Sequence, residues 1–256
     1  MRAIDTHCHL LHTIKKGAKL GNIIKNAENA NVIAMIDSPV YLEDYAQAIR
    51  FHKSYPKQVF ITLGSSPASY HEVDIEKTIE QIKIFTEKGQ IVGIGEVGLD
   101  YYWVKNHNLR ERQHLVFSQF IELANELQMP LVIHSREAED DALIDLQKAE
   151  TQVVMHSYGG SIETAQKCVD RGYFISIPTC VTTRKKHRNL VMHLPIESLL
   201  TETDSPYLSP FPEEKRNEPA NVIYGVKEIA KLKEISEDEV AEITTRNAIK
   251  IFNLPF

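Results

Sequence analysis

The segment Asp5-Thr-His7-Cys-His9 ends a short apolar run at the start of the chain, and its pattern predicts a buried strand that carries metal ligands. Because side chains alternate between the two faces of a strand, His7 and His9 point to the same side. Two imidazoles on one face make half of a typical metal site. Cys8 faces the other way, and we expect it to be a buried packing residue.

Four later apolar runs also deliver a ligand-type side chain at or just past their ends. They are residues 91–94 before Glu96, 131–133 before His134, 153–155 before His156, and 199–200 before Asp204. A single histidine is more often an ordinary surface or core residue than a ligand. The recurrence of imidazoles and carboxylates at equivalent strand ends therefore predicts a metal centre far better than any one of them does.

Apolar runs alternate with helical patterns along the whole chain. The runs predict strands at residues 3–6, 32–37, 59–64, 91–97, 131–134, 153–156, 173–177 and 199–202. Helical spacing predicts helices at residues 20–30, 41–55, 75–85, 109–127, 138–148, 162–171, 185–194, 221–232 and 237–252. The last helix has a capping box, formed by Ser236 and Glu239.

Eight short strands that alternate with helices favour an α/β fold, a TIM (β/α)8 barrel, formed by a single domain over residues 1–256. In such barrels the catalytic residues lie at the C-terminal ends of several strands. Strands one, four, five, six and eight each supply a candidate ligand here. An open sheet would not easily bring the first strand beside the fourth to the eighth, so the ligand pattern supports the closed barrel.

Composition narrows the class of protein. Hydrophobic residues make up 43% of the 256 residues and charged residues 25%, which is ordinary for a soluble globular protein. The net charge of -6 argues against broad coating of nucleic acid by a basic surface. We find no apolar run of membrane-spanning length and no signal peptide, and we expect no membrane association. Three cysteines without paired spacing favour a reducing cytoplasm over a disulfide framework.

The candidate ligands together predict a centre for two divalent cations. These ligands are His7, His9, Glu96, His134, His156 and Asp204. We expect Glu96 to bridge the two ions and water to fill the open positions. Such a pair of ions polarises a substrate oxygen and lowers the pKa of a bound water to about 7. Asp204 is placed to accept a proton from that water as a general base. The identity of the ions stays open among Mg²⁺, Mn²⁺ and Zn²⁺.

Four segments resemble the signatures of the TatD family of metal-dependent deoxyribonucleases. They are Asp5-Thr-His-Cys-His-Leu10, Ile94-Gly-Glu-Val-Gly-Leu-Asp-Tyr-Tyr102, His134-Ser-Arg-Glu-Ala138 and Thr201-Glu-Thr-Asp-Ser-Pro-Tyr-Leu208. The resemblance implies a TIM barrel of the amidohydrolase superfamily that cuts DNA, often as a 3′-to-5′ exonuclease. It also implies that His7, His9 and Asp204 hold the first metal ion, and that His134 and His156 hold the second. Glu96 would lie between both ions.

Two positions depart from the family pattern. Where the family usually has Gly-x-His-Pro after the third strand, this chain has Gly64-Ser-Ser-Pro67, so that Ser66 replaces the histidine. After the sixth strand, His156-Ser-Tyr-Gly-Gly160 stands in place of His-Cys-Phe-Ser-Gly. Neither change removes a predicted ligand, but the loss of the histidine at Ser66 puts a substrate contact in question.

Further residues are candidates for substrate contacts. Arg136 is suited to a bidentate pair with a phosphate, and a salt bridge with a neighbouring acid is the alternative. Tyr101 and Tyr102 follow the fourth strand, where they stack on a base or pack as a loop lid. Arg184 and Lys185 begin a basic segment after the seventh strand, which either steers a polyanion or forms a solvated helix face. Glu202 is expected to be a hydrogen-bond partner near the site.

The predicted function is a metal-dependent hydrolase that cuts nucleic-acid phosphodiesters with a metal-bound hydroxide. DNA is the favoured substrate, single-stranded ends suit a barrel mouth, and no obligate protein partner is implied. One alternative is hydrolysis of an ester or amide, such as an aminoacyl ester on tRNA or a small cyclic amide. A second is a non-catalytic binding module stabilised by metal, although structural sites usually have only four closed ligands.

Overall fold

Eight parallel strands form the centre of the computed structural model, which describes residues 1–214 and 216–256. Each strand pairs with its successor in the chain, in the order β1 to β8. The strands are β1 (Ala3–Cys8), β2 (Val32–Asp37), β3 (Val59–Leu63), β4 (Gly93–Asp100), β5 (Leu131–Arg136), β6 (Val153–Met155), β7 (Phe174–Pro178) and β8 (Leu199–Glu202). All eight lie where the alternating apolar runs predict strands, and the TIM-barrel prediction is confirmed.

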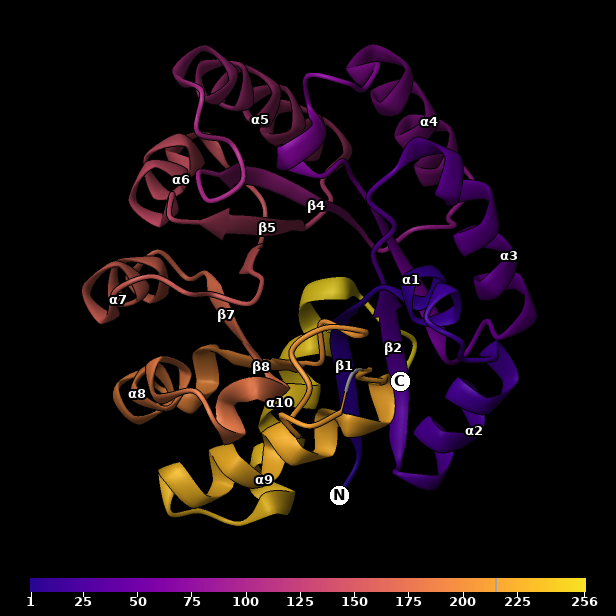
Figure 1. Ribbon diagram of the computed structural model, residues 1–256, viewed down its shortest axis with the longest axis vertical. Coiled ribbons are helices and arrows are strands. Elements are labelled where there is room, and N and C mark those ends of the chain that lie inside the picture. Colours follow the sequence, from indigo (N-terminus) through magenta and orange to yellow (C-terminus); the bar gives the residue numbers. More distant parts are fainter. Residues whose placement is uncertain (215) are drawn as a thin grey trace.

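Helices follow the strands around the outside of this sheet (Figure 1). They are α1 (Leu10–Lys15), α2 (Leu20–Asn29), α3 (Tyr45–Ser54), α4 (Ile75–Glu87), α5 (His107–Leu127), α6 (Glu139–Asp145), α7 (Ile162–Asp170), α8 (Lys185–His193), α9 (Val222–Lys233) and α10 (Glu237–Phe252). The sequence does not predict α1, because six residues are too few to display a helical period. The predicted helix at 41–55 begins only at Tyr45, after a 3₁₀ turn at Leu42–Asp44.

The first and last strands meet and close the sheet into a nearly complete barrel. Threonine hydroxyls form two of the contacts: Thr6 Oγ1 donates to the Thr201 carbonyl at 3.0 Å, and Thr201 Oγ1 donates to the Ile4 carbonyl at 3.1 Å. The Asp5 carboxylate accepts from the Thr203 amide and hydroxyl at 2.8 and 2.6 Å. These side-chain bonds supplement two backbone bonds across the seam, from the His9 amide to the Ser205 carbonyl at 2.7 Å and from the Asp204 amide to the His7 carbonyl at 2.9 Å.

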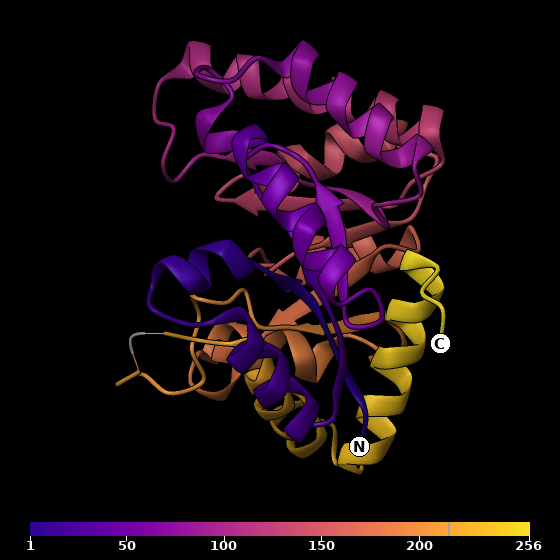
Figure 2. The same ribbon diagram turned by 90° about the vertical axis from the view of Figure 1, so that its right-hand side faces the viewer.

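The core has two layers, and α10 covers one end of the barrel. Side chains inside the barrel, such as Ile36, Val132 and Leu200, pack against Ile251 and Phe252 of α10. A larger layer lies between the strands and the outer helices. Figure 2 shows the N terminus beside α10, and the Met1 ammonium pairs with Asp238 at 2.8 Å. The N-terminal ends of the strands are thus closed, while their C-terminal ends stay open for a site.

Candidate metal centre

His7 in β1 and His9, just after it, turn the same nitrogen of each ring into the barrel mouth. His7 Nε2 and His9 Nε2 lie 3.4 Å apart. Ser38, the residue after β2, contacts the outer nitrogen of both rings: its carbonyl accepts from His9 Nδ1 at 2.8 Å, and its hydroxyl lies 3.3 Å from His7 Nδ1. The Ser38 hydroxyl in turn contacts Thr62 at 2.7 Å, so both rings are held from behind.

His156 and His134, on the other side of the mouth, also turn one ring nitrogen inward and contact a polar group with the other. His156 Nδ1 donates to Glu202 at 3.0 Å, and its ring stacks on that of His7 with centroids 3.6 Å apart. His134 is reversed, because its Nε2 contacts Asp100 at 2.9 Å and its Nδ1 points inward. The close groups are His7, His9 and Asp204, and His7, Glu96 and His156, while His134 contacts the cluster through Glu96. Each of the four rings has a polar partner behind it, as metal-ligating histidines generally do.

Glu96 lies between these histidines, inside β4 and not at its end. The pairing of β4 with β5 shifts at this point: Gly95 pairs with Val132 and Val97 with Ile133, so Glu96 is left out of the ladder. This bulge directs its side chain into the mouth. Oε2 is 3.4 Å from His7 Nε2, and Oε1 is 2.7 Å from His134 Nδ1. The two oxygens thus face different histidines, as a bridging carboxylate requires.

Glycine makes room for Glu96. A methyl group on Gly64, just after β3, would lie 2.5 Å from the Glu96 carbonyl oxygen. Any larger residue would push β4 away from β3, and only glycine permits so close an approach.

Asp204 closes the cluster from the turn after β8. Its amide donates to the His7 carbonyl at 2.9 Å, and its φ of +54° is a left-handed conformation that Asp tolerates better than most residues. Oδ1 lies 3.3 Å from His9 Nε2 and 3.9 Å from His156 Nε2. The backbone bond that helps to close the barrel is therefore also the one that places this carboxylate.

The donor set fits a cation. The Ser38 carbonyl can only accept, so His9 Nδ1 carries a hydrogen, and in the neutral ring Nε2 presents a lone pair. That lone pair faces Asp204 Oδ1 and, at 3.7 Å, Glu96 Oε2. Acceptors that converge in this way repel one another unless a cation or a proton lies between them. Within the described chain, no lysine or arginine pairs with either carboxylate.

The pKa values of the buried ligands are shifted by the charges of their neighbours. Burial lowers the pKa of His9, but the hydrogen bond and charge of Asp204 outweigh it and raise the pKa to about 9. Burial raises the pKa of Glu96, but the charge and hydrogen bond of His134 hold it well below its usual value. Burial and the charge of His156 lower the pKa of His7. The shifts of His9 and Glu96 favour an ionised carboxylate beside a positive charge, and the shift of His7 favours a neutral ring with a free lone pair. A divalent ion binds in such an environment.

Two cavities open on either side of this cluster. The cationic cavity has a volume of about 410 Å³, and its wall includes Arg136, Arg184, Lys186, His156 and Asp204. The aromatic cavity has a volume of about 480 Å³, and its wall includes Tyr41, Trp103, Tyr207, His9 and Glu96. His134 lines both cavities. Ser66, where the family pattern has histidine, lies in the wall of the aromatic cavity.

The predicted substrate contacts divide into two groups. Arg136, Tyr102 and Arg184 line the cationic cavity, and the Arg136 guanidinium stacks on Tyr102 at 3.7 Å from the ring centroid. Tyr101 and Lys185 are not among the residues that line either cavity. The Tyr101 hydroxyl instead donates to Asp141 at 2.8 Å. Lys186 lines the cationic cavity in place of the predicted Lys185, because consecutive side chains of α8 point in different directions around the helix. The composition of the segment does not show which of the two lysines faces the cavity.

Sequence reasoning missed two residues that hold the histidines. Ser38 and Asp100 are 0% and 2% exposed and follow or end apolar strands, as the candidate ligands do. Their position at a strand end is the only sequence feature that points to them. It is a weak signal, because serine and aspartate are common in turns after strands.

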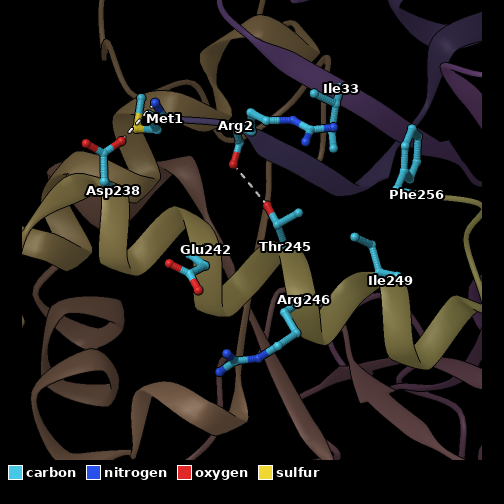
Figure 3. Close-up of a pocket in the computed structure, with 9 residues that line it drawn as sticks. All are labelled: Met1, Arg2, Ile33, Asp238, Glu242, Thr245, Arg246, Ile249 and Phe256. Atoms are coloured by element: carbon cyan, nitrogen blue, oxygen red, sulfur yellow. Dashed lines mark hydrogen bonds and ion pairs between the residues drawn. The ribbon is translucent and has the colours of Figure 1, made fainter.

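The cavity shown in Figure 3 is larger, at about 640 Å³, but it is unrelated to the cluster. It lies between the start of β1 and α10, and Thr245 donates there to the Arg2 carbonyl at 3.0 Å. None of the six candidate ligands lines it. It is therefore at the end of the barrel opposite to the one where such folds hold their chemistry.

Comparison with known proteins extends these findings. The model of the family described as TatD related DNase matches residues 4–253. An uncharacterized metal-dependent hydrolase of Methanocaldococcus jannaschii is 35% identical over 98% of this chain and 97% of its own length. A human protein named deoxyribonuclease TATDN3 is 32% identical over 97% of this chain and 94% of its own.

A solved structure agrees with the fold. The crystal structure of YJJV, a TatD homologue from Escherichia coli, has a TM-score of 0.88 at 26% identity and covers 99% of both chains.

Among the described residues, none of the helices combines the length and the apolar character that crossing a membrane requires.

Proposed function

The chain belongs to the family of TatD-related DNases, and on that premise we propose that it is a deoxyribonuclease that shortens single-stranded DNA from its 3′ end with two divalent cations. Its family and its relatives make it a metal-dependent hydrolase. The observation that carries the finer proposal is the set of imidazoles around Glu96: ring nitrogens of His7, His9 and His134 lie 3.4, 3.7 and 2.7 Å from its oxygens, and His156 groups with His7 and Glu96 within 4.8 Å.

Each residue has a role in this proposal. His7, His9 and Asp204 would hold one ion, His134 and His156 the other, and Glu96 both. The ions, when bound, would polarise the phosphoryl oxygen and lower the pKa of water at the site. Histidine-rich ligation favours Mn²⁺ or Zn²⁺ over Mg²⁺. Burial raises the pKa of Asp204, but the hydrogen bond of His9 lowers it below its usual value. Asp204 thus stays ionised and ready to accept the proton of the attacking water.

The cationic cavity supports a phosphate-bearing substrate. Arg136, Arg184 and Lys186 lie in its wall beside three of the candidate ligands, in a chain whose net charge is -6. Glu137 and Glu139 also line this wall, and Glu137 pairs with Lys105 at 3.2 Å. The three cations supply local partners for phosphates, which a neutral ester or amide would not require.

The test uses 5′-labelled and 3′-labelled single-stranded oligonucleotides with Mn²⁺ or Mg²⁺. We expect progressive shortening of the 5′-labelled strand and release of a labelled mononucleotide from the other, both abolished by chelator. Asp204→Asn should lower the rate at least about 100-fold, because it removes both a ligand and the proton acceptor. Asp170→Asn, which changes an exposed carboxylate on α7, should leave the rate unchanged.

Other outcomes would assign another function. Intact DNA together with release of a carboxylate from an ester or amide would favour amidohydrolase chemistry. No hydrolysis of any kind, with a melting temperature that chelator lowers, would indicate a metal-stabilised binding module.

A further inference from the structure

Three exposed aromatic side chains surround the aromatic cavity. Tyr41 is 38% exposed, Trp103 67% and Tyr207 43%. They come from the loops after β2, β4 and β8, which are far apart in the sequence. Large aromatic groups that stay exposed over a concave wall leave apolar surface in water, which is unfavourable unless a flat ligand covers it.

The backbone that carries two of these rings is hydrogen-bonded to residues of the metal centre. The Trp103 amide donates to Asp100 Oδ1 at 2.7 Å, and the other oxygen of Asp100 contacts His134. The Tyr207 amide donates to the Asp204 carbonyl at 2.8 Å. The points from which the Trp103 and Tyr207 side chains extend are therefore fixed relative to the candidate ligands, which favours a defined distance between a stacked base and the phosphate at the metal centre.

The two cavities differ in charge. Among the residues that the structure describes, no lysine or arginine lines the aromatic cavity, whereas three line the cationic cavity. Lys16 lies outside this lining, with its Nζ 4.5 Å from the centroid of the Tyr207 ring. Arg136 stands near the boundary, with its guanidinium carbon 5.8 Å from the Trp103 ring centroid. A substrate that spans both cavities would then place phosphates on one side of the metal centre and an uncharged, flat group on the other.

We propose that the aromatic cavity binds the nucleobase of the 3′-terminal nucleotide by stacking against Trp103 and Tyr207, while the cationic cavity holds the phosphates of the remaining strand. This inference rests on the proposed function. The terminal nucleoside carries only the scissile phosphate, and the metal centre would hold that group. The cavity that binds its base therefore requires no lysine or arginine. A volume of about 480 Å³ lies within the range of about 300–1,000 Å³ that ligand pockets occupy.

The binding test uses the fluorescence of Trp103, which is the only tryptophan of the chain. The metal-loaded protein is titrated with deoxyadenosine 5′-monophosphate and, separately, with deoxyribose 5-phosphate, which has no base. We expect saturable quenching by the nucleotide and little by the sugar phosphate. Tyr207→Ala should weaken nucleotide binding by about 5- to 100-fold. Phe256→Ala, which removes an aromatic ring 47% exposed at the other end of the barrel, should have no effect. Equal quenching by both compounds, or none by either, would overturn the proposal.

The cleavage test separates this proposal from the function on which it rests. Oligonucleotides with an ordinary and an abasic 3′ end are compared. We expect Trp103→Ala to raise KM for the ordinary end by about 5-fold or more and to leave the abasic end unchanged. Cleavage of both ends with the same KM would refute the base pocket and leave the nuclease intact. Nucleotide-specific quenching without any cleavage would do the reverse.

Discussion

At the scale of single residues, the inward direction of each histidine depends on the group behind it. Ser38, Asp100 and Glu202 contact the outer nitrogens and thereby decide which nitrogen is free for a cation. The sequence predicts the histidines from their position after apolar runs. It predicts less about the partners, because a serine or an acid near a strand end has many ordinary uses.

Glu202 provides the test at this scale. Glu202 is fully buried, and its Oε2 accepts from His156 Nδ1. Glu202→Gln keeps the volume but removes the charge that orients this ring, so metal affinity should fall by about 10-fold. Affinity is measured by competition with a fluorescent chelator. The melting temperature of the metal-free protein should change little. Glu197→Gln, at an exposed position just before β8, is the control. Equal metal affinity in wild type and Glu202→Gln would show that Glu202 does not position His156.

At the scale of elements, helix boundaries follow local chemistry where the signal is strong. Ser236 caps α10 as the capping box predicts, with its hydroxyl oxygen accepting from the Glu239 amide at 3.1 Å. The strand β4 behaves differently. The prediction ends it at Val97, but it continues to Asp100, and Glu96 lies at a bulge inside it. A bulge depends on pairing with β5, which is not local information.

Ser236→Ala should lower the free energy of unfolding by about 1 kcal/mol, because the Glu239 amide loses its acceptor. For a chain of this length the melting temperature should fall by about 2–4 °C. Since α10 packs against the interior of the barrel, the loss should appear in the global transition. Ser54→Ala removes a hydroxyl that donates to the Arg50 carbonyl of α3 and caps no helix start, so its effect should be under about 0.5 kcal/mol. Unfolding at the same denaturant concentration in both variants would contradict this role of the cap.

At the scale of the whole molecule, the site exists because the barrel closes. His7 lies in the first strand, His9 directly after it, and Asp204 in the turn after the last strand. They meet only because β1 and β8 are joined, and the seam between them depends on Thr6, Thr201 and Asp5. The geometry of the candidate centre is therefore coupled to the topology of the fold.

Thr201→Val tests this coupling. Thr201 is 1% exposed, and without its hydroxyl the buried Ile4 carbonyl loses a donor. The free energy of unfolding should therefore fall by about 1–3 kcal/mol. Metal affinity should fall in the same variant, because the seam also places Asp204. Thr245→Val removes a similar bond to the Arg2 carbonyl at a half-exposed position, where water can replace it, and should cost little. Full stability in Thr201→Val, measured by urea unfolding, would show that the seam does not depend on this hydroxyl.

The sequence by itself determined the class of fold and the identity of the candidate ligands, because periodicity, strand ends and motifs are properties of neighbouring residues. Only the tertiary structure decided which atoms face one another. Three features arise from contacts between segments about 30 to 200 residues apart. They are the tautomer of His9, the contact of the two Glu96 oxygens with different histidines, and the separation of the aromatic from the cationic cavity. Such contacts depend on strand register and ring closure, which no local pattern encodes.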